Sequence, residues 1–403
     1  MIVLHVATLN QPIRNDLGYG PIETVVYNLD KGLHELGHRS IVACSGDSQV
    51  VGEQFTTIEQ SFSEYCTDHT LVKQEQMLRH LVLSLQRAQR GDIDVIHMHD
   101  ADMTEYMFNG VWHSPVPIVM TLHVPAEDHR GFTRWNDTLI SSSSAYFVPI
   151  SEYQRSQHQG LVNGQKVIHH GIDVADYPFN SSSGQSLSSK YDYLFSIGRI
   201  TPDKGQNIAI EIAKKTGSRL ILAGNVQNKE KDREFFKKIQ HSIDLVADGA
   251  QPFTGSDYFE QVMKPILDSD KQIIYIGEVN SAQKKLWYHH ACATLFPIQW
   301  GEPFGLVLIE SMACGTPVLA FDKGSVPEIV VHGKTGFVVD SIDHMTEAVK
   351  AIHLLDPSDC RQHVKDHFSI ASMARKYSDL YQWIVDERTL CLKTFPSVTG
   401  LSF

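Results

Sequence analysis

The sequence predicts an α/β protein of two domains, each built on a parallel β-sheet with helices on both faces. Three observations predict this fold class. The chain has 403 residues, which is too long for one hydrophobic core. Short apolar runs alternate with longer segments of helical periodicity, as in parallel sheets. This alternation is interrupted at 180–189 by Asn-Ser-Ser-Ser-Gly-Gln-Ser-Leu-Ser-Ser, a stretch too poor in apolar residues to pack.

In the first half, short apolar runs predict strands, and the segments between them predict helices. The expected strands are 2–7, 39–44, 94–98, 116–121 and 145–150. The expected helices are 22–36, 71–90 and 152–160. We therefore assign residues 1–180 to an N-terminal domain.

The alternation restarts after the polar stretch, which predicts a second domain over 190–379. Its expected strands are 193–197, 219–223, 273–276, 293–296, 318–321 and 336–339. The segment 225–270 is a long insertion with a charge run at 229–232 and helical periodicity over 235–246. We interpret it as a surface elaboration, and a contact with a partner or a second copy is the alternative.

Composition narrows the function classes. The apolar fraction of 42% and the charged fraction of 20% are those of a globular protein. A net charge of −12 argues against nucleic acid as a partner, because phosphate backbones need a basic face. The six cysteines lack metal-ligand spacing and are read as free thiols. With no basic leader and no membrane-length apolar run, the sequence predicts a cytoplasmic protein.

The segment from Glu302 to Gly315, Glu-Pro-Phe-Gly-Leu-Val-Leu-Ile-Glu-Ser-Met-Ala-Cys-Gly, places two carboxylates around the start of an expected helix. Gly305 leaves the first backbone N–H groups of that helix uncovered, so an anion can bind at Gly305, Leu306 and Val307. Each carboxylate can accept from two hydroxyls, as the vicinal diols of a hexose or a ribose offer. Two solvated charges flanking an ordinary helix are the alternative reading of this spacing alone.

A second motif, Ser196-Ile-Gly-Arg-Ile-Thr-Pro-Asp-Lys-Gly205, follows an expected strand and leads into a helical pattern over 207–216. Such a loop lies at the carboxyl end of a parallel strand, where open α/β sheets bind ligands. The guanidinium of Arg199 and the ammonium of Lys204 can therefore hold two phosphates from different sides. A surface turn with two solvated cations is the alternative.

These two motifs resemble the donor site of the retaining GT-B glycosyltransferases of glycosyltransferase family 4. The resemblance implies two facing Rossmann-like domains with a cleft between them. It also implies that Arg199 and Lys204 bind the donor diphosphate, that Glu302 lies near the sugar and that Glu310 accepts from the ribose. The helical pattern over 370–385 resembles the family's terminal helix, so residues from about 380 to 403 are expected to pack back on the N-terminal domain.

Two glycine-bearing segments resemble further donor-side elements of this family. Gly18-Tyr-Gly20-Pro opens the first expected helix and resembles the loop that approaches the donor phosphate or sugar, where glycine permits close backbone approach. Glu23 stands at the place of the third glycine of a dinucleotide fingerprint, which argues against hydride transfer as the activity. The segment Gly277-Glu-Val279-Asn resembles the one where backbone groups meet the nucleotide base. Recognition by backbone groups does not distinguish uracil, guanine and adenine. UDP is assumed because it is the commonest nucleotide of such donors.

His123 ends an expected strand, at the position where the family has a histidine that touches the transferred sugar. A structural histidine is the alternative. The run His97-Met-His99-Asp-Ala-Asp102 suggests a metal site, but His97 and His99 on one face are not a closed ligand set. We therefore expect no metal.

The sequence thus predicts a retaining glycosyltransferase that uses a nucleoside diphosphate sugar and no cofactor. The resemblance implies Glu302, His123, Arg199 and Lys204 as catalytic residues and a sugar, glycolipid or small molecule as acceptor, held by loops such as 125–135. A nucleotide-sugar 2-epimerase and a non-catalytic nucleotide-sugar sensor are the alternatives. Core packing explains the apolar stripe of the basic helix 73–90, so the sequence gives no indication of membrane contact and does not define an oligomeric state.

Overall fold

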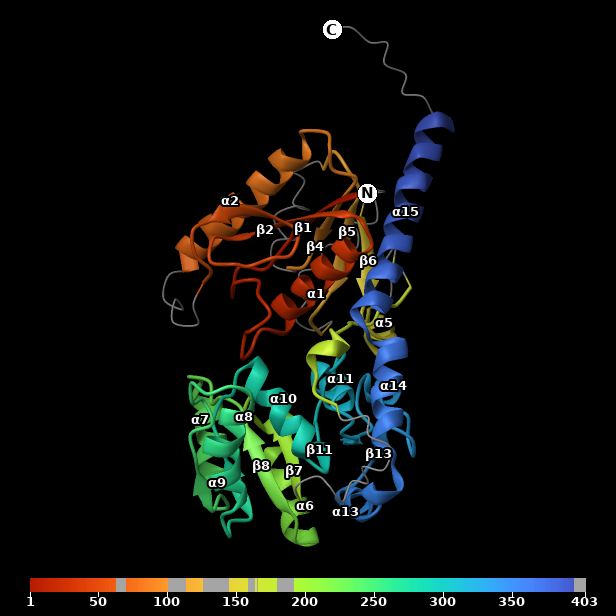
Figure 1. The fold of residues 1–403 in the computed structure, drawn as a ribbon. Coiled ribbons are helices and arrows are strands. Elements are labelled where there is room, and N and C mark those ends of the chain that lie inside the picture. The colour runs from red at the N-terminus through yellow and green to blue at the C-terminus, as the bar shows by residue number, and fades with distance from the viewer. Residues whose placement is uncertain are drawn as a thin grey trace, which may run out of the picture.

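The computed structural model describes residues 1–62, 70–100, 114–125, 145–158, 164, 166–179 and 192–394. Two sheets form the centres of two domains, one above the other in Figure 1. Every pair of neighbouring strands in the described residues is parallel. The predicted α/β class with two Rossmann-like domains is confirmed. The polar connection at 180–189, Asp102 and most of the loop 125–135 lie outside the described residues.

The N-terminal sheet has the order β3-β2-β1-β4-β5-β6. Its strands are β1 Ile2–Val6, β2 Arg39–Ser45, β3 Glu53–Ile58, β4 Val95–Met98, β5 Ile118–Leu122 and β6 Ala145–Pro149. Alternate residues of β1 point to opposite faces: Leu4 packs in one buried cluster with Leu81 of α2 (Thr70–Ala88), and Val3 packs in another with Leu29 of α1 (Pro21–Glu35). The short helix α5 (Glu152–Gln157) follows β6.

The C-terminal sheet has the order β13-β12-β11-β7-β8-β10-β9. Its strands are β7 Tyr193–Ile197, β8 Arg219–Ala223, β9 Leu245–Val246, β10 Ile273–Tyr275, β11 Ala293–Phe296, β12 Val318–Phe321 and β13 Gly336–Val339. The helices of this half are α6 Gln206–Thr216, α7 Glu230–Gln240, α8 Gly255–Tyr258, α9 Lys264–Leu267, α10 Ser281–His290, α11 Leu306–Ala313, α12 Val326–Ile329, α13 Ile342–Lys350 and α14 Pro357–His367. Separate buried clusters lie on the two faces of the sheet.

The insertion over 225–270 is a packed part of the C-terminal domain. The helix predicted over 235–246 is wrong in its bounds, because α7 ends at Gln240 and β9 adds an edge strand to the sheet. Tyr258 is fully buried, and its hydroxyl donates to the Gly249 carbonyl at 2.8 Å and accepts from the Trp287 indole at 2.9 Å. These contacts tie the insertion to the domain core.

The terminal helix α15 (Ile370–Thr394) runs alongside the N-terminal domain (Figure 1). Met373, Tyr377 and Tyr381 pack in the same buried cluster as Leu29 of α1. The contact of α15 with the N-terminal domain begins at Ile370, before the expected residue 380. Gly32 of α1 has no Cβ, which would lie 2.6 Å from the Ile370 side chain, so α1 and α15 can meet at this point. Within the described residues, no helix combines the length and the apolar character needed to span a membrane.

Candidate active site

A cavity of about 360 Å³ lies between the two domains, at the carboxyl ends of strands from both sheets. Three groups of residues line it. The N-terminal domain contributes Tyr19, Pro21, Ile22, His123, Val124, Pro125, Ile150 and His170. The loop after β7 contributes Ile197, Gly198, Arg199 and Lys204. The segment that leads from β11 into α11 contributes Phe296, Trp300 and all residues from Glu302 to Val307.

The N-terminus of α11 faces this cavity without a side-chain cap. Gly305 precedes the helix with a φ of 83°, a left-handed conformation that favours glycine, and among the described residues no side chain caps the first helical N–H groups. Gly305, Leu306 and Val307 all line the cavity. The free N–H groups and the helix dipole therefore provide a place for an anion.

Glu302 and Lys204 form an ion pair in the cavity wall. The Lys204 ammonium donates to Glu302 Oε2 at 2.9 Å, and the two side chains are 18% and 13% exposed. The same ammonium lies over the Trp300 ring, 5.1 Å from its centroid. The two residues stand in different sequence motifs, whose spacing does not predict this pair. In this pair, the carboxylate and the cation neutralise each other.

Close backbone packing holds the loop that carries Lys204. Gly205 has a φ of 74°, and a Cβ there would lie 2.1 Å from the carbonyl oxygen of Pro297. The backbone N–H of Gln299 donates to the Asp203 carbonyl at 2.8 Å. The guanidinium of Arg199, on the same loop, donates a long hydrogen bond of 3.4 Å to Gln227 Oε1.

Glu310 lies on the buried side of α11 and is not among the residues that line the cavity. Its carboxylate accepts from the Lys284 ammonium at 2.6 Å and from the hydroxyls of Tyr288 and Tyr177 at 3.1 and 3.5 Å. Burial, followed by the Glu310 charge, raises the pKa of both tyrosines well above their usual value, so they stay protonated and donate. These three partners were not predicted from the sequence motifs.

The glycine-rich loop touches the C-terminal domain. A Cβ at Gly18 would lie 3.3 Å from the carbonyl oxygen of Val279, so the two predicted donor-side segments meet across the domain boundary. Gly18, Gly20 and Val279 do not themselves line the cavity, whereas Tyr19 does. Glu23, behind this loop, is buried, and burial raises its pKa to about 7.

His123 lines the cavity and ends a chain of imidazoles. His123 Nε2 and His99 Nδ1 are hydrogen-bonded at 3.1 Å, and His99 Nε2 and His5 Nδ1 are bonded at the same distance. The His123 ring stacks on His170 with centroids 5.2 Å apart. Burial lowers the pKa of His99 and His170 well below 6.5, so these rings are neutral at physiological pH.

Within the described residues, His5, His97 and His99 are the one group of three potential ligands whose ring nitrogens all lie within 4.8 Å of one another. Both nitrogens of His97 are already bonded to hydroxyls, Tyr381 at 2.6 Å and Thr121 at 2.7 Å. The three rings are thus parts of a hydrogen-bond network in this structure. A metal ion there would have to replace those bonds.

Comparison with known proteins agrees with this geometry. Residues 180–366 match the family Glycosyl transferases group 1, and residues 20–176 match Glycosyltransferase Family 4. The D-inositol 3-phosphate glycosyltransferase of Corynebacterium efficiens is 25% identical over 349 residues, 74% of this chain and 73% of that protein. The N-acetyl-alpha-D-glucosaminyl L-malate synthase of Bacillus anthracis is 23% identical over 310 residues, 73% of this chain and 76% of that protein.

Solved structures share the whole fold. Anabaena Alr3699/HepE in complex with UDP-glucose superposes with a TM-score of 0.66 at 16% identity, covering 95% of this chain and 99% of that one. The sucrose-phosphate synthase of Thermosynechococcus elongatus gives a TM-score of 0.68 at 17% identity, covering 96% and 99%. The chain belongs to the GT-B glycosyltransferases of glycosyltransferase family 4 and is an enzyme of the transferase class.

Proposed function

We propose that the protein transfers a sugar from a nucleoside diphosphate sugar to an acceptor, with retention at the anomeric carbon. The observation that carries this proposal is that Arg199, Lys204, Glu302 and the open N-terminus of α11 line one cavity, with His123 from the opposite domain. Two cations and a helix terminus suit a diphosphate, and a carboxylate suits sugar hydroxyls. UDP is the proposed nucleotide, because the related Anabaena structure contains UDP-glucose.

In the proposed reaction, the bond between the anomeric carbon and the diphosphate oxygen breaks, and the electron pair stays on that oxygen. Arg199, Lys204 and the α11 N-terminus stabilise the departing charge. Glu302 stabilises the positive charge that develops at the anomeric carbon. The acceptor oxygen then bonds to that carbon on the face that the diphosphate leaves, and the departing phosphate takes the acceptor proton.

A thermal-shift panel with UDP-, GDP- and ADP-glucose tests this function. A ligand at about 100 times its dissociation constant stabilises the native state by about 2.7 kcal/mol. We expect the UDP sugar to give the largest rise in Tm, and NMR of the glycoside formed from it to show the donor's anomeric configuration. Consumption of the donor without acceptor, yielding its 2-epimer, would instead identify an epimerase.

Arg199→Ala and Lys204→Ala are each expected to weaken UDP binding by a factor of about 10 to 100, and to weaken uridine binding far less. The reason is that charge-assisted hydrogen bonds to phosphate are worth about 1.5–3 kcal/mol each. Uridine has no phosphate and cannot make these bonds, so it has none to lose. Calorimetry with both ligands measures the difference. Equal losses for UDP and uridine would rule out the diphosphate role.

Excess EDTA is expected to leave sugar transfer essentially unchanged. Arg199, Lys204 and the helix dipole already supply the positive charge that a metal ion would bring to the diphosphate. Initial rates with and without chelator provide the measurement. Loss of activity that Mg²⁺ or Mn²⁺ restores would show that the expectation of a metal-free site is wrong.

A further inference from the structure

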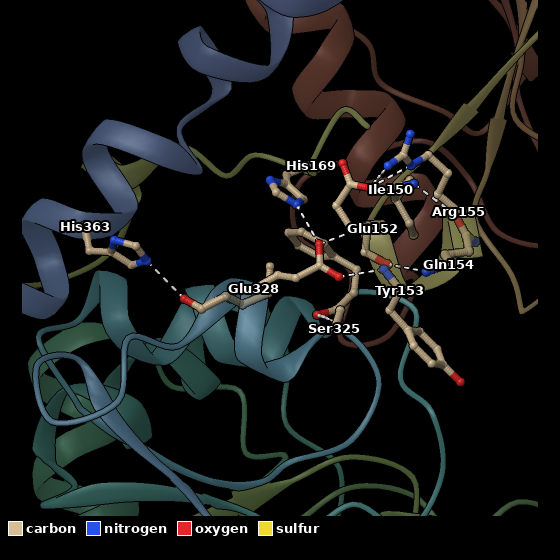
Figure 2. A network of polar contacts seen from close by, with 12 residues as sticks. Ile150, Glu152, Tyr153, Gln154, Arg155, His169, Ser325, Glu328 and His363 are labelled. Atoms are coloured by element: carbon tan, nitrogen blue, oxygen red, sulfur yellow. Dashed lines mark hydrogen bonds and ion pairs between the residues drawn. The ribbon is translucent and has the colours of Figure 1, made fainter. Parts of the chain in front are cut away.

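Glu328 joins the two domains beside the cavity. It lies on α12 of the C-terminal domain, and its carboxylate accepts from the backbone N–H groups of Glu152 and Tyr153, at 2.7 Å each, at the start of α5 in the N-terminal domain (Figure 2). His169 Nε2 lies 3.4 Å from Glu328 Oε2. Burial would raise the pKa of Glu328, but the hydrogen bonds from His169 and the two amides hold it below its usual value. The carboxylate is therefore ionised where it caps α5.

On the donor side, the turn before α12 packs directly on the backbone of Glu302. The Ser325 N–H donates to the Glu302 carbonyl at 2.9 Å, and the Ser325 hydroxyl donates to the Phe304 carbonyl at 2.9 Å. A Cβ at Gly324 would lie 2.3 Å from the Glu302 nitrogen. Any movement of α12 is therefore transmitted to the segment that presents Glu302 to the cavity.

On the other side of the cavity, α5 fixes the backbone around His123. Leu122 and Val124 lie on either side of His123. The buried Gln154 amide donates to their carbonyls, at 2.6 Å to Leu122 and at 2.8 Å to Val124. Its side-chain oxygen accepts from the Ile150 N–H at 2.9 Å. The capped helix thus holds the end of β5 that carries His123.

Tyr153 adds a second contact across the domain boundary. A Cβ at Gly301, the residue before Glu302, would lie 1.8 Å from the Tyr153 hydroxyl oxygen. The Tyr153 side chain therefore packs directly on the backbone of Gly301, next to Glu302. The start of α5 is fixed against both α12 and the Glu302 segment.

We propose that Glu328 is a positioning residue that holds Glu302 and His123 in register across the cavity. This proposal rests on the proposed function, because it assigns Glu302 and His123 to the two sides of one sugar. Glu328 acts through the backbone and does not line the cavity. Arg199, Lys204 and α11 lie within the C-terminal domain, so loss of the Glu328 contact leaves the diphosphate site assembled. The expected signature is a loss of turnover without a loss of nucleotide affinity.

The test compares Glu328→Gln and Glu328→Asp with Asp356→Ala. Gln keeps the shape but loses the charge and one acceptor, and Asp keeps the charge on a shorter stem. Asp356 is a matched control, because it is exposed and caps α14 within one domain, accepting from the Ser358 N–H at 2.8 Å. The readouts are kcat and KM for UDP-glucose turnover, UDP affinity by calorimetry, and amide exchange of the peptides covering 122–125 and 151–157.

We expect Glu328→Gln to lower kcat about a hundredfold, equivalent to about 2.7 kcal/mol, and Glu328→Asp to lower it about tenfold. The UDP dissociation constant should stay within about threefold for both. Exchange should rise in both peptides for the Glu328 variants, and Asp356→Ala should change neither kcat nor those peptides. In a His123→Ala background, Glu328→Gln should cost much less than in the wild type, because the two residues act on the same step.

Unchanged kcat in both Glu328 variants would overturn the positioning role alone, and so would a parallel loss of UDP binding. The positioning role would also be overturned if the effects of Glu328→Gln and His123→Ala on kcat were fully additive. A wild-type protein that turns over none of UDP-, GDP- and ADP-glucose would overturn the proposed function, and the positioning role with it. Glu328→Asp keeps the negative charge, so it still tests the positioning role if Glu328→Gln fails to fold.

Discussion

Glu302→Gln is expected to lower turnover about a hundredfold, which corresponds to about 2.7 kcal/mol of lost transition-state stabilisation. Glu302 lines the cavity just before α11, and in the proposed function the donor sugar lies beside it. Positive charge develops on that sugar only in the transition state, so a carboxylate beside it accelerates the reaction more than it tightens binding.

The ion pair with Lys204 sharpens this expectation. Glu302 Oε2 accepts from the Lys204 ammonium at 2.9 Å, so the carboxylate partly neutralises a cation that is proposed to bind phosphate. Removing the negative charge frees that cation, and UDP should bind as tightly as before or more tightly. The measurements are kcat with the wild type's best donor and UDP affinity by calorimetry.

Glu347→Gln is the control for this substitution, because Glu347 is exposed on α13 and pairs only with Lys350 among the described ion pairs. It should leave kcat and UDP affinity unchanged. If Glu302→Gln mainly abolishes binding of UDP, which has no sugar, Glu302 does not act on the sugar as proposed.

Four strands of the C-terminal sheet, β7, β8, β11 and β12, were predictable because each is an apolar run that is almost wholly buried. The expected bounds of β7, β11 and β12 agree with the structure to the residue. β3 was missed because its sequence, Glu-Gln-Phe-Thr-Thr-Ile, is polar at the start, as an edge strand allows. β9 has only two residues, too few for any periodicity.

The local chemistry of the site could likewise be predicted motif by motif, but the pairing between motifs could not. Glu302 and Lys204 are far apart in the chain, and their contact depends on how the β7 loop packs on Pro297. The Lys284–Glu310 pair depends on the packing of α10 against α11. Glu328 reaches α5 only because the two domains meet at that point. Side-chain type and spacing within a motif do not contain this information.

Glu310→Gln is expected to raise the donor KM and to weaken UDP binding by a factor of up to about 100, with less effect on kcat than Glu302→Gln has. In the proposed role, the Glu310 carboxylate accepts from the ribose hydroxyls equally in the ground and transition states. Such a contact changes affinity and leaves the rate of the bound complex alone. Uridine should lose as much affinity as UDP, which distinguishes Glu310 from Arg199 and Lys204.

The structure adds a second effect of this substitution, on stability. Lys284 is 15% exposed and donates to Glu310 at 2.6 Å, so a neutral glutamine leaves a largely buried ammonium without its counter-charge. Removing one member of a buried ion pair costs about 3–5 kcal/mol, and replacing both members with neutral groups costs much less. Glu310→Gln should therefore lower Tm, and Lys284→Met in the same chain should restore much of that loss.

The double variant separates the two effects. If Glu310 contacts the ribose, Glu310→Gln/Lys284→Met recovers Tm but keeps the weakened binding of uridine and UDP, as calorimetry on the folded protein would show. Lys284→Met alone is the matched control, since it leaves the carboxylate free for the ribose and should bind both ligands at least as well as the wild type. Recovery of affinity together with Tm in the double variant would mean that Glu310 acts only by holding α10 against α11, and the ribose role would be wrong.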